Sequence, residues 1–149
     1  MTLYAILKFL HVAPVIIAVG ANVTYAFWLR AAGRDRERLL FTIPAVRRLD
    51  RRVANPAYIV ILLTGLAMVA MGPYDFSAGW VTLSLVLYVA VAIFGIAVFA
   101  PAIRRQLAEA ERDPSSDAYA KAATRSLQFA GLAVAITFVI VFLMVTKPF

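Results

Sequence analysis

Four long apolar stretches, separated by polar segments, dominate the pattern of the chain. They run over residues 3–29, 54–71, 80–100 and 127–145. Each reaches the roughly 18–20 residues that an α-helix needs to cross a hydrocarbon core of about 30 Å. The strict apolar–polar alternation of membrane strands is absent. The pattern therefore predicts an all-α fold, a four-helix transmembrane bundle that forms a single domain over residues 1–149.

The composition agrees with a membrane protein. Hydrophobic residues make up 63% of the chain and charged residues only 15%, whereas soluble domains are about half apolar and a quarter charged. The chain contains no cysteine, which excludes disulfides, Cys-ligated zinc and thiol catalysis.

Basic residues predict the direction of the four spans. The net charge is +7, and most cations lie in two polar segments, about 30–53 and 101–126, whereas the link 72–79 has none. This asymmetry is typical of membrane orientation and not of a nucleic-acid-binding surface, so no nucleic-acid partner is expected. Both basic segments are predicted to be cytoplasmic loops, which places both termini on the non-cytoplasmic side of a multi-pass protein of the inner (plasma) membrane.

The first span is expected to be a retained helix and not a cleaved signal peptide. Its opening residues 1–4 carry no positive charge, and Arg30 and Arg34 follow the apolar stretch instead of preceding it. Such an arrangement favours insertion with the N-terminus outward.

The arginines of the two basic segments are also candidate contacts for anionic lipid head groups. Each basic residue near such a surface contributes about 1 kcal/mol of attraction. Orientation alone explains these arginines equally well. The residues concerned are Arg47, Arg48, Arg51, Arg52, Arg104 and Arg105.

Local signals predict where helices begin and end. Asn55 followed by Pro56 is typical of a capped helix start, which places the beginning of the second spanning helix there. Residues 104–111 read as a helical continuation of the third span. The segment 113–117 then breaks the helix, and Ser116 or Asp117 is the predicted cap of the next one.

His11, the single histidine, lies in the outer part of the first span. Lys8, His11 and Asn22 follow a three/four spacing and therefore share one helix face, which we expect to point into the bundle. His11 would ligate a metal ion or haem, with haem b the leading cofactor candidate, or would relay protons. The alternative is a plain hydrogen bond to a neighbouring helix.

Small residues within the spans predict close helix packing. They allow two helix backbones to approach, either inside the bundle or between copies of the chain. The residues concerned are Thr64, Gly65, Gly95, Gly131 and Ala135.

The carboxylates fall in loops or at helix ends, Asp50 among them. A proton- or cation-coupled transporter usually needs a carboxylate inside the membrane, so this distribution weighs against transport. No nucleotide-binding loop, nucleophile elbow or zinc-protease helix is present, and an enzyme is not expected.

Five short motifs occur in a characteristic order along most of the chain. They are Leu7-Lys8-Phe9-Leu10-His11-Val12, Pro56-Ala57-Tyr58-Ile59, Leu63-Thr64-Gly65-Leu66, Trp80 with Leu85-Val86-Leu87-Tyr88, and Pro101-Ala102-Ile103-Arg104-Arg105. In this order they resemble a bacterial family of predicted integral membrane proteins, domain of unknown function 2269. More distantly, the chain is similar to copper-resistance D-type proteins and HemJ-type protoporphyrinogen oxidases, which implies association with haem or metal.

Three functions are therefore under consideration. The first is a non-catalytic accessory subunit of a larger membrane complex, or a homo-oligomer. The second is a haem- or metal-binding membrane redox protein that uses His11. The third is a small-solute transporter.

Overall fold

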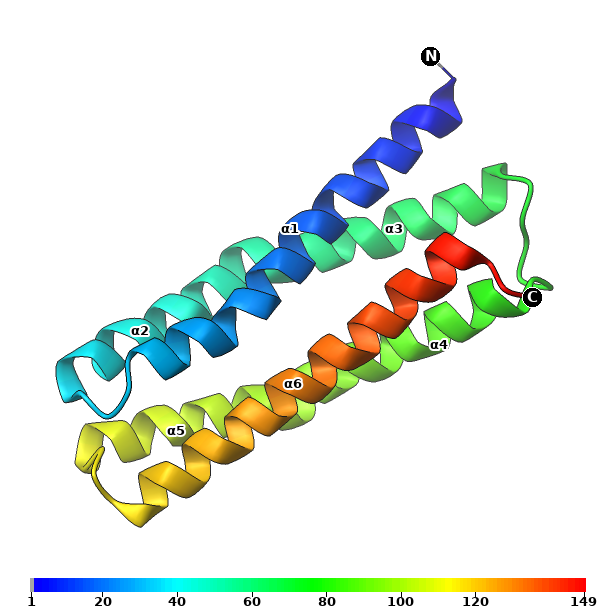
Figure 1. Cartoon of the computed structure of the whole chain (residues 1–149). Helices are drawn as coiled ribbons and strands as arrows, with labels where there is room; N and C mark the ends of the chain where they lie inside the picture. Colours follow the sequence, from blue (N-terminus) through cyan, green and yellow to red (C-terminus); the bar gives the residue numbers. More distant parts are fainter. Residues whose placement is uncertain (1) are drawn as a thin grey trace.

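The computed structural model describes residues 2–149 and is helical throughout that range apart from its turns and ends. The elements are α1 (Leu3–Ala31), α2 (Arg36–Leu49), η1 (Asp50–Ala54), α3 (Asn55–Met71), α4 (Gly79–Phe94), η2 (Gly95–Phe99), α5 (Ala100–Arg112) and α6 (Asp117–Thr146). Helix α2 continues through η1 into α3, and α4 continues through η2 into α5, so four long rods result (Figure 1). Each rod is long and apolar enough to cross a membrane. The predicted all-α fold with four spans is confirmed.

Two of the rods are much longer than a bilayer is thick. The rod Arg36–Met71 has 36 residues, which corresponds to about 54 Å at 1.5 Å per residue, against about 30 Å of hydrocarbon. Most of segment 30–53 is therefore helix, and so is most of segment 101–126. Helices α2 and α5 are amphipathic and bury apolar faces against the rest of the bundle, so these segments between the spans are folded parts of it; their cytoplasmic location stays a prediction.

The helix start predicted at Asn55 is also wrong. Asn55 has helical backbone angles, and its N–H bonds to the carbonyl of Asp50, five residues back, which closes the π-helical turn η1. Pro56 has no N–H to offer, and the wide turn accommodates this within one continuous rod. The second π-helical turn, η2, likewise lies directly before a proline-containing helix start, at Pro101.

The break between α5 and α6 forms as predicted. Helix α5 ends at Arg112, and Ser116 caps α6 by accepting a 3.1 Å hydrogen bond from the Tyr119 N–H. The helical continuation of the third span and the Ser116 cap are both confirmed.

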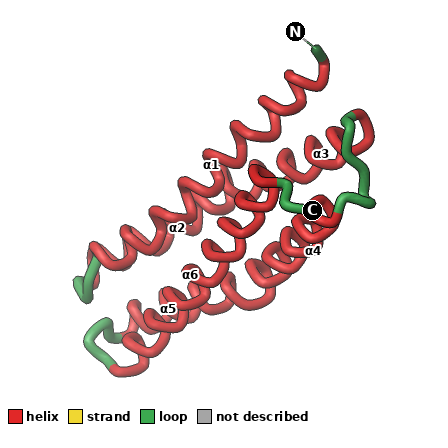
Figure 2. Tube along the Cα trace, turned by 45° about the vertical axis from the view of Figure 1, so that its right-hand side comes forward, coloured by secondary structure: helices red, strands yellow, loops and turns green. Residues whose placement is uncertain are grey.

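The rods form two hairpins. In one, α1 packs along α3; in the other, α4 and α5 pack along α6. The hairpins meet where α2 contacts α5 and where α1 contacts α6, but no Cα atom of α3 lies within 8 Å of α4 or α6. Figures 1 and 2 show that the hairpins diverge toward the end that carries the two termini.

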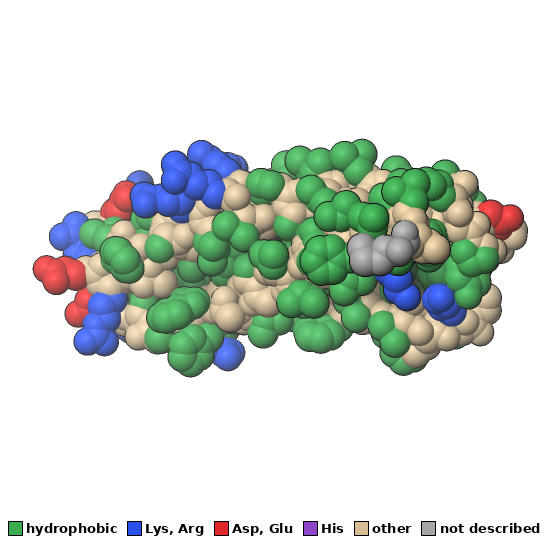
Figure 3. All heavy atoms as spheres, turned by 90° about the horizontal axis from the view of Figure 1, so that it is seen from above, with side chains coloured by type: hydrophobic (Ala, Val, Ile, Leu, Met, Phe, Trp, Pro, Cys, Tyr) green, Lys and Arg blue, Asp and Glu red, His purple; other side chains and the backbone are tan. Residues whose placement is uncertain are grey.

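The closed end contains the main hydrophobic core. This core is formed by Leu29, Ala32, Leu39, Ile43, Ile103, Ala110 and Tyr119. The hairpin tips are tied there by three hydrogen bonds to backbone carbonyls: from the Arg34 guanidinium to Ser115 at 3.5 Å, from the Arg36 guanidinium to Glu111 at 2.9 Å and from the Tyr119 hydroxyl to Gly33 at 3.4 Å. Charged side chains gather around this end in the space-filling view (Figure 3). The apolar middle and the charged end thus match a membrane part and a polar projection.

Candidate functional site

The His11 side chain packs against α3. Its Nδ1 lies 3.1 Å from the Thr64 hydroxyl oxygen, and that hydroxyl donates its only proton to the helix carbonyl of Val60 at 2.6 Å. The Thr64 oxygen is therefore the acceptor in the contact with His11, so Nδ1 carries the imidazole proton. In a neutral ring the lone pair then lies on Nε2, the arrangement seen in histidine ligands of metals.

Gly65 provides the space for the His11 ring. A Cβ added at Gly65 would lie 3.1 Å from Cε1 of His11, so a larger side chain would press on the imidazole. Thr64 and Gly65 therefore form one contact surface on α3 for the His11 ring.

Lys8 does not belong to this site. Its side chain is exposed, although α3 extends past its level, because the Tyr4 ring lies 2.9 Å from a Cβ added at Gly72 beyond the end of α3. The prediction that Lys8 points into the bundle is therefore wrong: the three/four spacing places a residue near the face of His11 but does not fix which side chains the neighbouring helix covers.

A second polar group lies deeper along the same face of α1. The Asn22 amide donates a hydrogen bond to the Tyr58 hydroxyl on α3. The Tyr88 hydroxyl on α4 donates to the backbone carbonyl of Tyr58 at 2.6 Å, and the two tyrosine rings meet edge to face with centroids 6.4 Å apart. Asn22 is thus linked to α3 and, through Tyr58, to α4, while His11 has its own partner on α3.

Sequence reasoning missed this cluster and the acidic residue beside it. Asp50 is half-buried inside a continuous rod, not at a helix end. Tyr25 is 2% exposed, and its hydroxyl has no hydrogen-bond partner within residues 2–149. The signal available in the sequence was the position of Tyr58 and Tyr88 inside two of the apolar stretches, because a buried tyrosine hydroxyl usually needs a hydrogen-bond partner.

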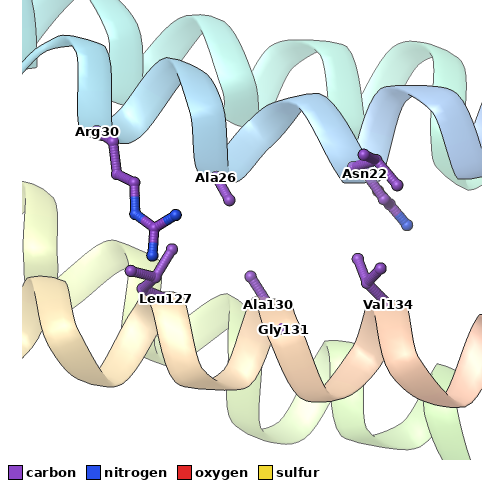
Figure 4. Close-up of a pocket in the computed structure, with 8 residues that line it drawn as sticks. Asn22, Ala26, Arg30, Leu127, Ala130, Gly131 and Val134 are labelled. Atoms are coloured by element: carbon purple, nitrogen blue, oxygen red, sulfur yellow. The ribbon is translucent and has the colours of Figure 1, made fainter.

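A groove separates α1 from α6 beside Asn22. It has a volume of about 210 Å³ and is lined by Asn22, Val23, Ala26, Arg30, Leu127, Ala130, Gly131 and Val134. In the close-up, Ala26 faces Ala130 across the groove, and the Arg30 side chain extends toward Leu127 at one end (Figure 4). A Cβ added at Gly131 would meet no atom within 4 Å. The small residues therefore leave space here and do not bring the helices into close contact.

Gly95 and Ala135 also lack an intramolecular packing role. A Cβ at Gly95 would meet nothing within 4 Å, and Ala135 is exposed. For Gly95 and Gly131 the prediction of close packing inside the bundle is wrong, because no neighbouring helix of the same chain reaches their surfaces. Packing between copies of the chain stays a prediction.

The predicted lipid-contacting arginines lie on α2, η1 and α5. Arg47 is half-buried and the other five are exposed. The one ion pair within residues 2–149 joins Arg112 to Glu109, so these six arginines form no ion pair with a carboxylate in the described chain. Within the same range, no three His, Cys, Asp or Glu side chains come together as a metal site.

Comparison with known protein families gives a match over most of the chain. A family model described as "Predicted integral membrane protein (DUF2269)" matches residues 5–148. No curated protein and no solved structure matches the chain.

Proposed function

The chain belongs to the DUF2269 family of predicted integral membrane proteins, and from this we propose that it is a non-catalytic membrane subunit that assembles as a homo-oligomer or as an accessory part of a larger membrane complex. The observation that carries the proposal is the incomplete packing of its membrane part. Helix α3 packs along α1 alone among the spanning helices, and α4 along α6 alone. Helices in lipid associate through close van der Waals contact, which small residues permit.

The surface around Gly95 suits such a contact. Gly95 leaves open space, and Ala92, one turn earlier on the same helix face, is small and exposed. A helix of a second subunit would approach the backbone at these two residues. Ala135, exposed on α6, would extend the same kind of small-residue surface.

Light scattering of the detergent-purified protein tests the homo-oligomer. We expect a particle containing more than one chain, and we expect Gly95→Leu to reduce it to a single chain. Gly20→Leu is the matched control, since Gly20 also has no atom within 4 Å of an added Cβ but lies on α1. A monomeric wild-type protein, or an unchanged mass in Gly95→Leu, would contradict self-association through this surface.

A haem- or metal-binding redox protein is the second candidate function. The observation that favours it is the His11–Thr64 contact, which leaves Nε2 of His11 as the ring nitrogen with a lone pair. An absorption spectrum recorded with and without dithionite tests it. A Soret band that disappears in His11→Ala would support haem b, whereas a colourless, metal-free preparation would exclude this candidate.

The proposed location is the inner (plasma) membrane, with both termini on the non-cytoplasmic side. The support is the concentration of arginines around α2 and α5, at the opposite end of the bundle from the termini (Figures 1 and 3). In this orientation the arginines at the inner ends of the spans lie at the level of the cytoplasmic head groups.

A further inference from the structure

The groove between α1 and α6 has a polar end and an apolar floor. Arg30 lies at the end nearest the charged tips of the bundle, and Ala26, Ala130, Gly131 and Val134 line the middle. At the other end the Asn22 amide donates to Tyr58. One charged group therefore lies at one end of a surface groove whose middle is apolar.

An apolar groove within the membrane part is filled most favourably by hydrocarbon. Empty space deprives the lining atoms of their dispersion contacts, and a water molecule needs two to four polar partners, which the apolar middle of the groove does not offer. A helix of another subunit does not fit, because an α-helix is about 10 Å wide and α1 and α6 already contact each other beside the groove. The occupant must be slender, like an acyl chain.

Arg30 favours an occupant of the groove that carries a negative charge. Its side chain extends across the groove mouth toward Leu127 (Figure 4). Within residues 2–149 the guanidinium makes neither a side-chain hydrogen bond nor an ion pair, unlike Arg36, which is bound to the Glu111 carbonyl. A guanidinium presents paired donors that match the oxygens of a phosphate.

The positions of Arg30 and Asn22 on α1 give the length of the groove. Arg30 and Asn22 are eight residues apart on α1, which corresponds to about 12 Å along the helix axis. We propose that the groove binds one anionic phospholipid of the cytoplasmic leaflet, with its phosphate on Arg30 and one acyl chain along Ala26, Ala130 and Gly131. The inference is independent of whether the chain assembles into oligomers, since the groove is complete within one chain.

Native mass spectrometry of the delipidated protein, with lipid added back, tests the site. Dioleoyl phosphatidylglycerol and dioleoyl phosphatidylcholine carry the same tails but differ in net charge. We expect the wild-type protein to retain the anionic lipid preferentially. Arg30→Gln should weaken its retention about fivefold, as expected for one basic residue at a membrane surface, and Gly131→Leu should abolish it by filling the groove.

Arg38→Gln is the matched control, because Arg38 is an exposed arginine on α2 that lies outside the groove and outside the predicted lipid-contacting set; its retention of the lipid should equal that of the wild type. Circular dichroism and a monodisperse elution profile establish that each variant folds. Equal retention of both lipids by the wild type would overturn the proposal, as would unchanged retention in Gly131→Leu. A loss in Arg30→Gln alone would also overturn it, since the head group would then bind without the groove. A lower particle mass in Gly131→Leu would instead identify a second copy of the chain as the occupant.

Discussion

The hydroxyl of Tyr88 donates a 2.6 Å hydrogen bond to the backbone carbonyl of Tyr58, and this bond joins the two hairpins across a gap that their helix backbones do not close. No Cα atom of α3 lies within 8 Å of α4, so two long side chains make the connection. Because Asn22 also binds Tyr58, three of the four rods meet through polar groups at this one level of the bundle.

Replacing Tyr88 by Phe should loosen the two hairpins. The variant keeps the ring and its edge-to-face contact but loses the hydrogen bond, which in membrane proteins contributes on the order of 0.6–1.7 kcal/mol. We expect a lower melting temperature in detergent. Tyr4→Phe is the control, since no hydrogen bond involves the Tyr4 hydroxyl in the described chain. Equal melting of the two variants would argue against the bridge.

The contact between His11 and Thr64 should be measurable as a coupling energy. We expect a double-mutant cycle with His11→Ala and Thr64→Ala to give a favourable interaction on the order of 0.5–1 kcal/mol, because the Nδ1 proton and the Thr64 oxygen pair directly. The measurement is reversible unfolding in mixed micelles. Strictly additive losses in the double variant would mean that the bond contributes nothing to the folded state.

The orientation of the chain can be checked with single cysteines, because the natural sequence has none. Ser77 and Ser115 are a matched pair: each is exposed and donates to an aspartate two residues earlier, one in the link after α3 and the other in the turn before α6. In intact spheroplasts a membrane-impermeant maleimide should label Ser77→Cys. Ser115→Cys should react only after permeabilisation. The reverse labelling pattern would invert the proposed topology.

The turn before α6 should make stability depend on acid pH. The Ser115 hydroxyl and then its backbone N–H hold the pKa of the Asp113 carboxyl below its usual range. A lowered pKa means that the ionised form stabilises the fold above the ordinary carboxyl pKa, and that this contribution is lost as the pH falls through the lowered value. Thermal melts between neutral and acid pH should therefore show a smaller decline for Asp113→Asn than for the wild type.

The corresponding turn before α4 allows an independent repeat of that measurement. The pKa of Asp75 is lowered chiefly by the Ser77 hydroxyl, so Asp75→Asn should reduce the acid sensitivity in the same sense. Identical pH profiles for both variants and the wild type would show that neither turn contributes.

The four spans and the cap at Ser116 were predictable because they depend on local properties, namely apolar length and the side chain that accepts the first free N–H groups. The pair Asn55–Pro56 led to the wrong prediction of a capped helix start, and the reason is physical. A capped helix start and a π-helical turn before proline carry the same local residues, and only the burial of α2 against its neighbours keeps the rod continuous.

The arrangement of the candidate sites needed the structure. Gly65 and Gly131 are both glycines in apolar stretches, yet Gly65 makes room for the His11 ring whereas Gly131 lines an open groove. The difference depends on where the two hairpins meet and where they part. Tyr58 and Tyr88 were missed for the same reason, because their contact depends on the relative register of helices that are not side by side.

The ties between the hairpin tips have a consequence for how the chain can be divided. Cutting between Gly72 and Pro73 would separate α1–α3 from α4–α6 and would leave the three tip hydrogen bonds and the shared core as contacts between two molecules. Two separately produced halves would therefore carry complementary surfaces, and co-expressing them is a way to rebuild the bundle from two helical hairpins in the plane of the bilayer.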